Sequence, residues 1–279
     1  MKRIAVTGGS GKAGRAVVKD LLEHGYQVVN VDAVAPAENL TRFRQVNLTQ
    51  SGEVFEALDG VDAVVHLAAI PNPDRFTPGH IFHNNTISCY NIFAAAQQLK
   101  LERVVWASSE TTLGLPFDRE QPAYAPLDEQ APPLPESSYA LSKILTEEMA
   151  RQFHRWSGIP FIGLRISNIK NPEQYAEFPS YWADARLRKW NLWGYVDVRD
   201  VAQGCRLGLE APVHGAEVFI LAAADTVMNR PSRDLLAEVF PGVALQKEIG
   251  QFETLLSIDK ARQVLGYAPR YSWRDHVKV

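Results

Sequence analysis

The sequence has few cysteines, no marked excess of either charge and no long apolar run. Its two cysteines among 279 residues, Cys89 and Cys205, exclude a disulfide framework and a cysteine-rich zinc site, so we expect reduced, buried thiols in a cytoplasmic protein. The 29 Lys and Arg residues face 32 Asp and Glu residues, without the basic surplus typical of nucleic-acid binding. No segment approaches the roughly 20 apolar residues of a membrane helix, and the chain leads directly into a strand, so we expect neither a membrane anchor nor a signal peptide.

Short apolar runs and segments of helical periodicity alternate through the first 166 residues. Predicted strands lie at 3–7, 26–31, 43–48, 62–67, 103–107 and 160–166. Predicted helices lie at 12–24, 52–58, 81–99 and 137–156. This alternation is typical of a parallel sheet covered on both faces, and right-handed crossovers make such a sheet doubly wound. We therefore predict an α/β fold with a dinucleotide-binding Rossmann domain over residues 1–166.

The regular alternation ends after residue 166, and we predict a small, discontinuous substrate lobe over 167–279, of which part of 196–225 returns to the Rossmann domain. Aromatic side chains are dense between 167 and 195, where they either stack on a sugar or form a core. Further helices are expected at 197–210, 231–240 and 259–265, with a strand at 217–221. The proline-rich segment 116–136 is too long for a turn, and such segments are usually functional lids or loosely ordered connectors.

The first predicted strand is followed by a glycine-rich turn that suits a dinucleotide. Gly8, Gly11 and Gly14 stand between this strand and the next helix. In such a turn the first glycine permits a tight bend, the second lets the backbone approach a pyrophosphate, and the third lets helix and strand pack closely. The helix N-terminus adds unpaired N–H groups and a positive dipole end. The pattern predicts a bound dinucleotide rather than a purely structural turn.

Asp32 ends the second predicted strand, 18 residues after Gly14, where a carboxylate can bind the ribose hydroxyls of adenosine. The same negative charge repels a 2′-phosphate, so NAD is favoured over NADP. Lys12, Arg42 and Arg44 are the opposing observation, because one of them could neutralise that phosphate. NADP therefore stays open as the less favoured cofactor.

Tyr139 and Lys143 stand four residues apart on a predicted helix, so their side chains share one face. A tyrosine, with an ordinary pKa of about 10, is a poor base at neutral pH, and a nearby ammonium favours its ionised form. Ser108 and Ser109 follow the fifth predicted strand, at the sheet edge where open α/β folds bind ligands. Ser109 either holds the substrate oxygen that gains or loses a proton, or caps the next turn. The pattern predicts acid–base chemistry.

These motifs resemble those of the extended short-chain dehydrogenase/reductases, also called NAD-dependent epimerases/dehydratases, over nearly the whole chain. The loop from Thr7 to Gly14 is similar to the cofactor loop of that family, and Tyr139-x-x-x-Lys143 to its catalytic pair. Further segments are similar to its strand motifs and later landmarks: 66–69, 106–109, 164–168, 195–201 and 261–269. The resemblance implies an enzyme that uses NAD, in which Tyr139 takes the proton, Lys143 supports it and Ser109 holds the oxygen.

The same resemblance implies a set of binding residues. Those for the cofactor are Gly8, Gly11, Lys12, Ala13, Gly14, Asp32, Asn47, Leu48, Leu67, Ala68, Ala69, Ala107, Ser108, Tyr139, Lys143 and Ile166. Those for the substrate are Asn85, Ser109, Thr111, Asn168 and Trp182. The resemblance implies no metal ion, and it implies a homodimer that pairs through the helices at 81–99 and 137–156.

The chain departs from the family pattern where the substrate is expected. Only 26 residues, 169–194, separate Asn168 from Tyr195, whereas nucleotide-sugar epimerases typically carry a longer segment there. The short span and the stretch 171–175 resemble the uronate dehydrogenases, which oxidise free sugar acids. The carboxylate-binding arginine of those enzymes is replaced by Ala176 here. Three arginines are candidates to replace it: Arg165, Arg186 and Arg188.

We therefore expect an NAD-dependent oxidoreductase that transfers a hydride between NAD and a small hydroxylated substrate, a sugar or a sugar acid. The first alternative is a (nucleotide-)sugar epimerase or dehydratase that retains its NAD, in which Glu110 could act as a second acid. The second alternative is a non-catalytic NAD(P)-sensing protein. The presence of Tyr139, Lys143 and Ser109 together argues against the sensor, because binding alone requires none of them.

Overall fold

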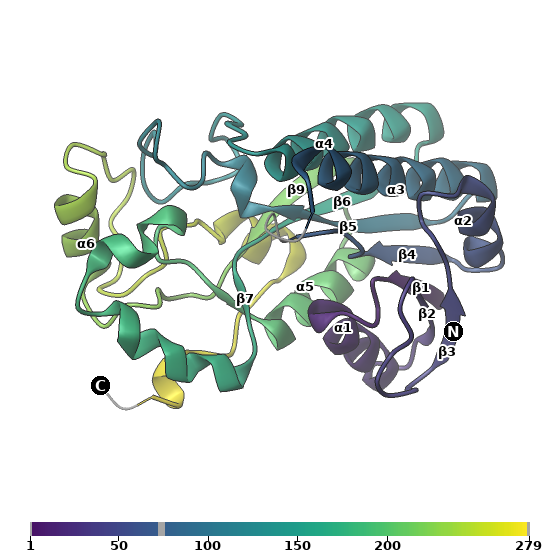
Figure 1. Ribbon diagram of the computed structural model, residues 1–279, viewed down its shortest axis with the longest axis horizontal. Coiled ribbons are helices and arrows are strands. Elements are labelled where there is room, and N and C mark those ends of the chain that lie inside the picture. The colour runs from purple at the N-terminus through teal and green to yellow at the C-terminus, as the bar shows by residue number, and fades with distance from the viewer. Residues whose placement is uncertain (1, 72–75, 278–279) are drawn as a thin grey trace.

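A seven-stranded parallel sheet organises the protein (Figure 1), for which the computed structural model describes residues 2–71 and 76–277. The strands are β1 (Arg3–Thr7), β2 (Gln27–Asp32), β3 (Arg42–Gln45), β4 (Ala63–His66), β5 (Arg103–Ser109), β6 (Phe161–Ile166) and β9 (Ala216–Leu221). Their order is β3-β2-β1-β4-β5-β6-β9, and every neighbouring pair is parallel. The predicted doubly wound Rossmann fold is confirmed.

Helices cover both faces of the sheet (Figure 1). On one face lie α1 (Lys12–Glu23) and α5 (Val198–Glu210), which pack against each other. On the other face α3 (Pro78–Leu99) packs between α2 (Ser51–Leu58) and α4 (Ser138–Ser157). Both ends of α4 are capped. The Ser137 side chain accepts a hydrogen bond from the Ala140 N–H at the N-terminus, and Gly158 ends the helix at φ +73°. These signals fix where the helix that carries Tyr139 begins and ends.

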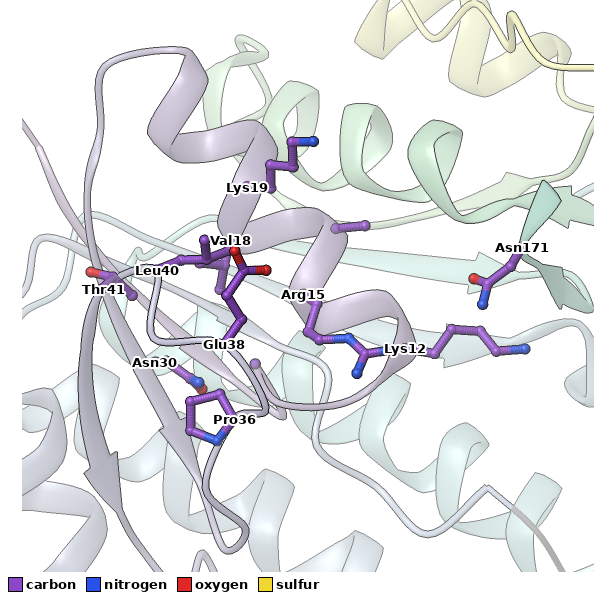
Figure 2. Close-up of a pocket in the computed structure, with 12 residues that line it drawn as sticks. Lys12, Arg15, Val18, Lys19, Asn30, Pro36, Glu38, Leu40, Thr41 and Asn171 are labelled. Atoms are coloured by element: carbon purple, nitrogen blue, oxygen red, sulfur yellow. The ribbon is translucent and has the colours of Figure 1, made fainter. Parts of the chain in front are cut away.

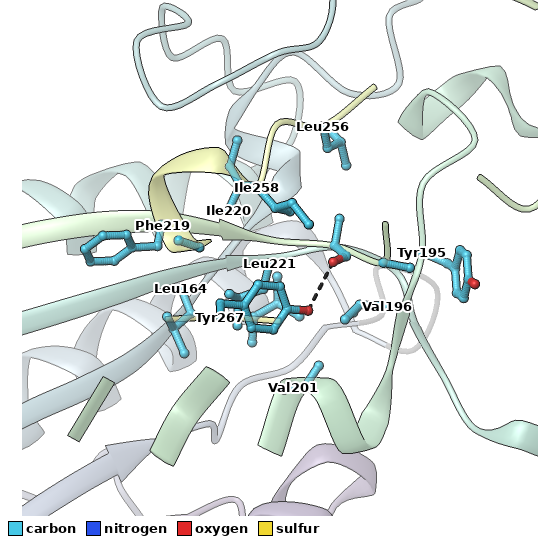
Figure 3. Packing of buried hydrophobic residues seen from close by; sticks show 14 of the residues in the cluster. Leu164, Tyr195, Val196, Val201, Phe219, Ile220, Leu221, Leu256, Ile258 and Tyr267 are labelled. Atoms are coloured by element: carbon cyan, nitrogen blue, oxygen red, sulfur yellow. Dashed lines mark hydrogen bonds between the residues drawn. The ribbon is translucent and has the colours of Figure 1, made fainter. Parts of the chain in front are cut away.

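The smaller lobe is built mainly from short turns. It contains α6 (Ser232–Val239), the two-stranded pair of β7 (Ile169–Lys170) with β8 (Val196–Asp197), and helical turns at 172–181, 185–191 and 273–275. One hydrophobic cluster runs from the α1–α5 face of the sheet into this lobe without interruption. Figure 3 shows its centre, where the hydroxyl of Tyr267 donates to the Ala222 carbonyl at 3.0 Å below β9. The lobe is therefore packed onto the Rossmann layers through a shared core.

The proline-rich segment 116–136 is not a loosely ordered connector, and that expectation was wrong, while its role as a lid stays a prediction. Its backbone pairs with the C-terminal part of the chain, because the N–H groups of Ala125 and Leu127 donate to the carbonyls of Ala244 and Leu255, both at 2.9 Å. Several of its side chains are buried in the core: Phe117, Ala125, Leu127 and Ala131. The partners of this segment lie more than 100 residues away, which is why no local pattern revealed the packing.

The aromatic run between 167 and 195 serves mainly as core. Tyr175, Phe178, Trp193 and Tyr195 are at most 1 % exposed, and their rings meet edge-on or tilted. The sequence left open whether the aromatic side chains stack on a sugar or form a core, and these four form a core. The other three aromatic residues of the stretch are half-buried: Tyr181, Trp182 and Trp190.

Several element boundaries differ from those expected. β5 continues to Ser109 instead of ending at residue 107, because Ser108 and Ser109 pair with the end of β6. The third strand ends at residue 45 rather than 48, and α3 begins at Pro78, a residue that suits the first turn of a helix. The helix expected at 259–265 is present with those bounds: an α-helical start at 259–260 leads into a wider turn at 261–265, which Gly266 ends at φ +73°.

The glycine turn after β1 is packed too tightly for side chains. Gly8 has φ +70°, and a Cβ there would lie 2.7 Å from the Ala68 nitrogen. A Cβ on Gly14 would lie 2.0 Å from the Gly8 carbonyl oxygen, well inside van der Waals contact. The first and third glycines therefore have the roles predicted for the bend and for close packing of α1 on the strand.

We predict that Gly14→Ala lowers the free energy of unfolding by about 1–3 kcal/mol or more, because the methyl group overpacks the turn. It should also weaken NAD binding. The matched control is Gly52→Ala in the first turn of α2, where a Cβ meets no heavy atom within 4 Å and where alanine should stabilise the protein by up to about 1 kcal/mol. Urea unfolding measures both, and equal stability of the two variants would contradict this packing.

Candidate active site

The start of α1 is shaped to receive a phosphate group. Gly11 is its N-cap, and no side chain of the described residues caps the first turn. The Gly11 N–H donates to the Gly8 carbonyl at 3.0 Å, so the turn is held by its own backbone. A Cβ on Gly11 would meet only that carbonyl oxygen, at 3.2 Å, which leaves this side of the turn open to a ligand. These residues fit the pyrophosphate of a dinucleotide.

Asp32 lies beside this turn at the end of β2. One carboxylate oxygen accepts the Ser10 N–H at 3.0 Å, and the other accepts the Val34 N–H at 3.1 Å. A carboxylate offers about four acceptor positions, so two remain for ribose hydroxyls. The backbone bonds thus hold the charge at the position predicted for adenosine.

Two of the cations that could favour NADP are engaged elsewhere. The Lys12 ammonium donates to the Gln174 side chain at 2.8 Å, across to the smaller lobe. The Arg44 guanidinium donates to the Glu56 carbonyl at 2.6 Å, at the end of α2. Arg42 is exposed on β3. These contacts leave Asp32 as the dominant charge held at the end of β2.

The other residues predicted for the cofactor lie around the strand ends. Leu67, Ala68 and Ala69 follow β4, where the Ala68 backbone approaches Gly8, and Ile166 ends β6. Asn47 is exposed, and its amide oxygen accepts the N–H and the hydroxyl of Thr49. Asn47 thus organises its own turn, and its predicted role toward the adenine stays a prediction, as do those of Ala13 and Leu48.

Among the three predicted catalytic residues, Lys143 is held in place by burial and by a hydrogen bond to β5. It is 6 % exposed, and its ammonium donates to the Ala107 carbonyl on β5 at 2.7 Å. The same nitrogen lies 5.5 Å from the centre of the half-buried Tyr139 ring. The structure thus brings the two side chains together on one face of α4, as their spacing predicted.

Ser109 caps the turn at 110–112 and also remains able to bind a substrate. Its Oγ accepts hydrogen bonds from the N–H and the hydroxyl of Thr111, at 3.2 and 3.0 Å. A hydroxyl that accepts still has its own proton to donate. The capping reading from the sequence is therefore correct, and the proton of Ser109 is left for a substrate oxygen.

A buried network that the sequence did not reveal joins α4 to β5 and β6. The Arg165 guanidinium forms a bidentate ion pair with Glu147 at 3.0 and 2.9 Å, and the Ser108 hydroxyl donates to the same carboxylate at 2.5 Å. The Ser108 side chain, predicted to bind the cofactor, therefore points into this network. Glu147 stands four residues after Lys143 on the same helix face, which is the signal that could have identified it.

A second buried acid, Glu110, lies directly after Ser109. Its carboxylate accepts the Ser167 hydroxyl at 2.5 Å and the Asn191 side chain at 3.3 Å. Burial raises the pKa of Glu110 to about 7, although these hydrogen bonds and the charge of Arg188 lower it. The carboxyl group thus exchanges its proton near neutral pH at the junction of the sheet and the smaller lobe.

The predicted substrate residues divide into two groups. Ser109, Thr111 and Asn168 lie together at the ends of β5 and β6, where the Asn168 amide oxygen accepts a long hydrogen bond, 3.5 Å, from Arg188. Asn85 and Trp182 are used elsewhere. The Asn85 side chain accepts a hydrogen bond from the Ile70 N–H and donates one to the Ile70 carbonyl. The Trp182 indole packs against Trp273 and donates to the Val227 carbonyl.

His66 at the end of β4 serves the fold. Its Nδ1 is paired with the Thr7 hydroxyl at 2.6 Å, and the ring is buried. Burial, together with the charge of Lys143, lowers the pKa of His66 to about 3, so the imidazole is neutral. In the described parts of the chain, no group of three His, Cys, Asp or Glu side chains is arranged to hold a metal ion.

A pocket of about 250 Å³ opens beside α1 (Figure 2). It lies between α1 and the segment 36–41, with Lys12, Arg15 and Lys19 of α1 among its lining residues, and Asn30 at its base. Neither Asp32 nor any of the three predicted catalytic residues lines it. We therefore place the chemistry at the ends of β5 and β6 and assign this pocket no catalytic role.

A family model decides the classification. The model described as "NAD dependent epimerase/dehydratase family" matches residues 4–222. The chain belongs to this family. As a member of the NAD-dependent epimerase/dehydratase family it is an enzyme, and NAD is its cofactor, as the glycine turn and Asp32 predicted. Among the residues the structure covers, no helix is long and apolar enough to span a membrane.

Curated relatives within the family have different activities. A putative UDP-glucose 4-epimerase from Methanocaldococcus jannaschii is 28 % identical, over 99 % of this chain and 96 % of its own. An L-arabinose 1-dehydrogenase (NAD(P)(+)) from Haloferax volcanii is 27 % identical, over 81 % of this chain and 90 % of its own. Membership therefore does not choose between epimerase and dehydrogenase.

Solved structures share the fold. A short-chain dehydrogenase/reductase superfamily protein from Agrobacterium tumefaciens with bound NAD matches with a TM-score of 0.75 and 23 % identity, over 97 % of this chain and 93 % of that one. A mutated uronate dehydrogenase matches with a TM-score of 0.70 and 22 % identity, over 98 % and 84 %. At this identity the likeness concerns the fold alone.

We expect Tyr139→Phe to lower turnover by at least about 10³-fold while NAD binding persists, because it removes the proton acceptor and keeps the ring. NADH absorbance measures turnover, and calorimetry measures cofactor binding. The control is Tyr26→Phe, whose hydroxyl contacts Glu210 far from the site. Near-normal turnover of Tyr139→Phe would remove this residue from the mechanism.

Glu110 should make the protein less stable as pH rises. Its folded pKa of about 7 exceeds the ordinary 4.5, so the folded state binds more protons between these values and loses that advantage as pH rises through them. Glu110→Gln removes this titration. The difference in free energy of unfolding between this variant and wild type should therefore shift by about 2 kcal/mol in favour of the variant as pH rises from 5 to 8. Urea unfolding across that range, with exposed Glu120→Gln as the charge control, tests it. Parallel profiles for wild type and Glu110→Gln would show that the group is not titrating there.

Proposed function

We propose that the protein is an NAD-dependent dehydrogenase that oxidises a hydroxyl group of a small free sugar or sugar acid. The observation that carries the proposal is the short span of residues 169–194 between the predicted substrate residue Asn168 and Tyr195. Three of its aromatic side chains, Tyr175, Phe178 and Trp193, are buried in the protein itself. A nucleotide sugar needs a nucleoside pocket and several donors for a diphosphate, and so short a span offers little for both.

The residues at the strand ends supply the acid–base part of such a reaction. The Lys143 ammonium stabilises the phenolate form of Tyr139, this phenolate removes the hydroxyl proton and becomes the phenol, and the Ser109 hydroxyl donates to the substrate oxygen. NAD, when bound, accepts the hydride from the carbon that bears this oxygen. The hydroxyl becomes a carbonyl, NADH forms, and the proton passes from Tyr139 to water.

A sugar epimerase or dehydratase that retains its NAD is the second candidate. The names of the curated relatives favour it, since the Methanocaldococcus jannaschii protein is described as a putative UDP-glucose 4-epimerase. The position of Glu110 also favours it, because a buried carboxyl beside Ser109 that exchanges its proton near pH 7 could act as a second acid. The name of the Haloferax volcanii relative and the short span favour the dehydrogenase.

The predicted homodimer through α3 and α4 is part of the proposal. Apolar side chains are exposed on these two adjacent helices: Tyr90 on α3, and Leu141, Leu145 and Trp156 on α4. Pairing with a second copy would cover them.

A cytoplasmic location is also proposed. It is supported by Cys89 and Cys205, which are free thiols buried in the protein, and burial raises the pKa of each.

Calorimetric titration of the NAD-loaded protein tests the size of the substrate. We expect heat of binding from free uronic or aldonic acids or from neutral aldoses, and none from UDP or UDP-glucose at comparable concentrations. Micromolar binding of UDP alone would overturn the proposal and place the nucleotide-sugar epimerase first.

A further inference from the structure

Arg188 is a buried cation at the junction of the smaller lobe and the sheet. It lies in the helical turn at 185–191 and is 5 % exposed. Its guanidinium lies over the rings of Tyr181 and Trp190, at 5.2 and 4.8 Å from their centres. One nitrogen of the guanidinium, Nη2, donates to the Gly194 carbonyl at 3.1 Å and to the Asn168 amide oxygen at 3.5 Å. Arg188 therefore reaches Asn168, a residue of the predicted substrate site that lies two positions after β6.

The charge of this guanidinium is only partly balanced, because Glu110 acts on it without forming an ion pair among the described residues. Within the described residues no carboxylate lies within 4 Å of Arg188, and its buried Nε has no hydrogen-bond partner. Burial lowers the pKa of Arg188, and Glu110 is the acid that opposes this most strongly. Burying a charge without a paired ion is costly, and such groups usually face a ligand or a partner.

The other two candidate arginines do not combine these properties. Arg165 is also buried and its Nη1 also lacks a hydrogen-bond partner, but its charge is neutralised by the bidentate pair with Glu147. Arg186 is exposed, two residues before Arg188. Of the three arginines that the sequence left open, only Arg188 combines burial, an unused donor and contact with Asn168.

We propose that Arg188 binds the carboxylate of an acidic substrate and so selects a sugar acid over the corresponding neutral sugar. The inference rests on the proposed dehydrogenase function and names its substrate class. A guanidinium presents a planar set of N–H donors that matches the two oxygens of a carboxylate, and a carboxylate would supply both the missing charge and the missing acceptor for Nε. Asn168 and Ser109, at the ends of neighbouring strands, would then face the hydroxyl-bearing part of the same molecule.

Paired substrates and paired variants test this assignment. The probes are D-glucuronate against D-glucose and D-galacturonate against D-galactose, with kcat/KM measured from NADH formation. Wild type should prefer the acid of each pair. Arg188→Gln should lower kcat/KM for the acid by roughly 10- to 100-fold, the usual worth of a hydrogen bond to a charged group, and should change the neutral sugar little. Arg186→Gln removes the same charge from the neighbouring surface and should leave the preference unchanged.

The possible outcomes separate this inference from the proposed function. Wild-type preference for the neutral sugars, or an equal loss for acid and sugar in Arg188→Gln, would overturn the role of Arg188 while oxidation of free sugars stands. Epimerisation of UDP-glucose without net NADH from any free sugar would overturn the proposed function and, with it, this inference.

A binding measurement tests the same assignment without relying on turnover. The rise in melting temperature caused by glucuronate or galacturonate is compared in NAD-loaded wild type, Arg188→Gln and the charge-retaining Arg188→Lys. We expect the rise to be largest in wild type, smaller in Arg188→Lys and absent in Arg188→Gln. Acid-induced rises of equal size in wild type and in either folded variant would contradict the assignment.

Discussion

The buried ion pair between Glu147 of α4 and Arg165 of β6 is the constraint on which the active site depends. Because Ser108 of β5 donates to the same carboxylate, one side chain joins a helix to two neighbouring strands. Removing one partner of such a pair leaves a buried charge alone, at a cost of about 3–5 kcal/mol, so the register of α4 is strongly fixed. Lys143 lies one turn before Glu147 on the same face, and Tyr139 one turn before that.

The smaller lobe completes the site through polar contacts at the same strand ends. Glu110 follows Ser109 on β5, and Asn191 and Arg188 of the lobe surround it with donors and positive charge. In the proposed site, the catalytic groups therefore come from the Rossmann layers and the cation for the substrate comes from the turn at 185–191. This division allows one family to keep its acid–base chemistry while the bound molecule changes.

Sequence reasoning was most successful where the signal was local. The alternation of strands and helices is a short-range pattern that predicted the fold, and the glycine turn with Asp32 is another that predicted the cofactor. The packing of 116–136 and the pair of Glu147 with Arg165 join residues distant in the sequence, so periodicity could not show them. Arg188 was one of three equal candidates, because the sequence shows neither the exposure of Arg186 nor the ion pair that neutralises Arg165.

Net NADH production separates a dehydrogenase from an epimerase most directly. Protein loaded with NAD is given excess NAD together with a free sugar acid or with UDP-glucose, and NADH is counted per active site. We expect many equivalents of NADH from the sugar acid and no conversion of UDP-glucose. Conversion of UDP-glucose by protein that keeps its NAD bound, with no net NADH from any free sugar or sugar acid, would contradict a dehydrogenase of small substrates.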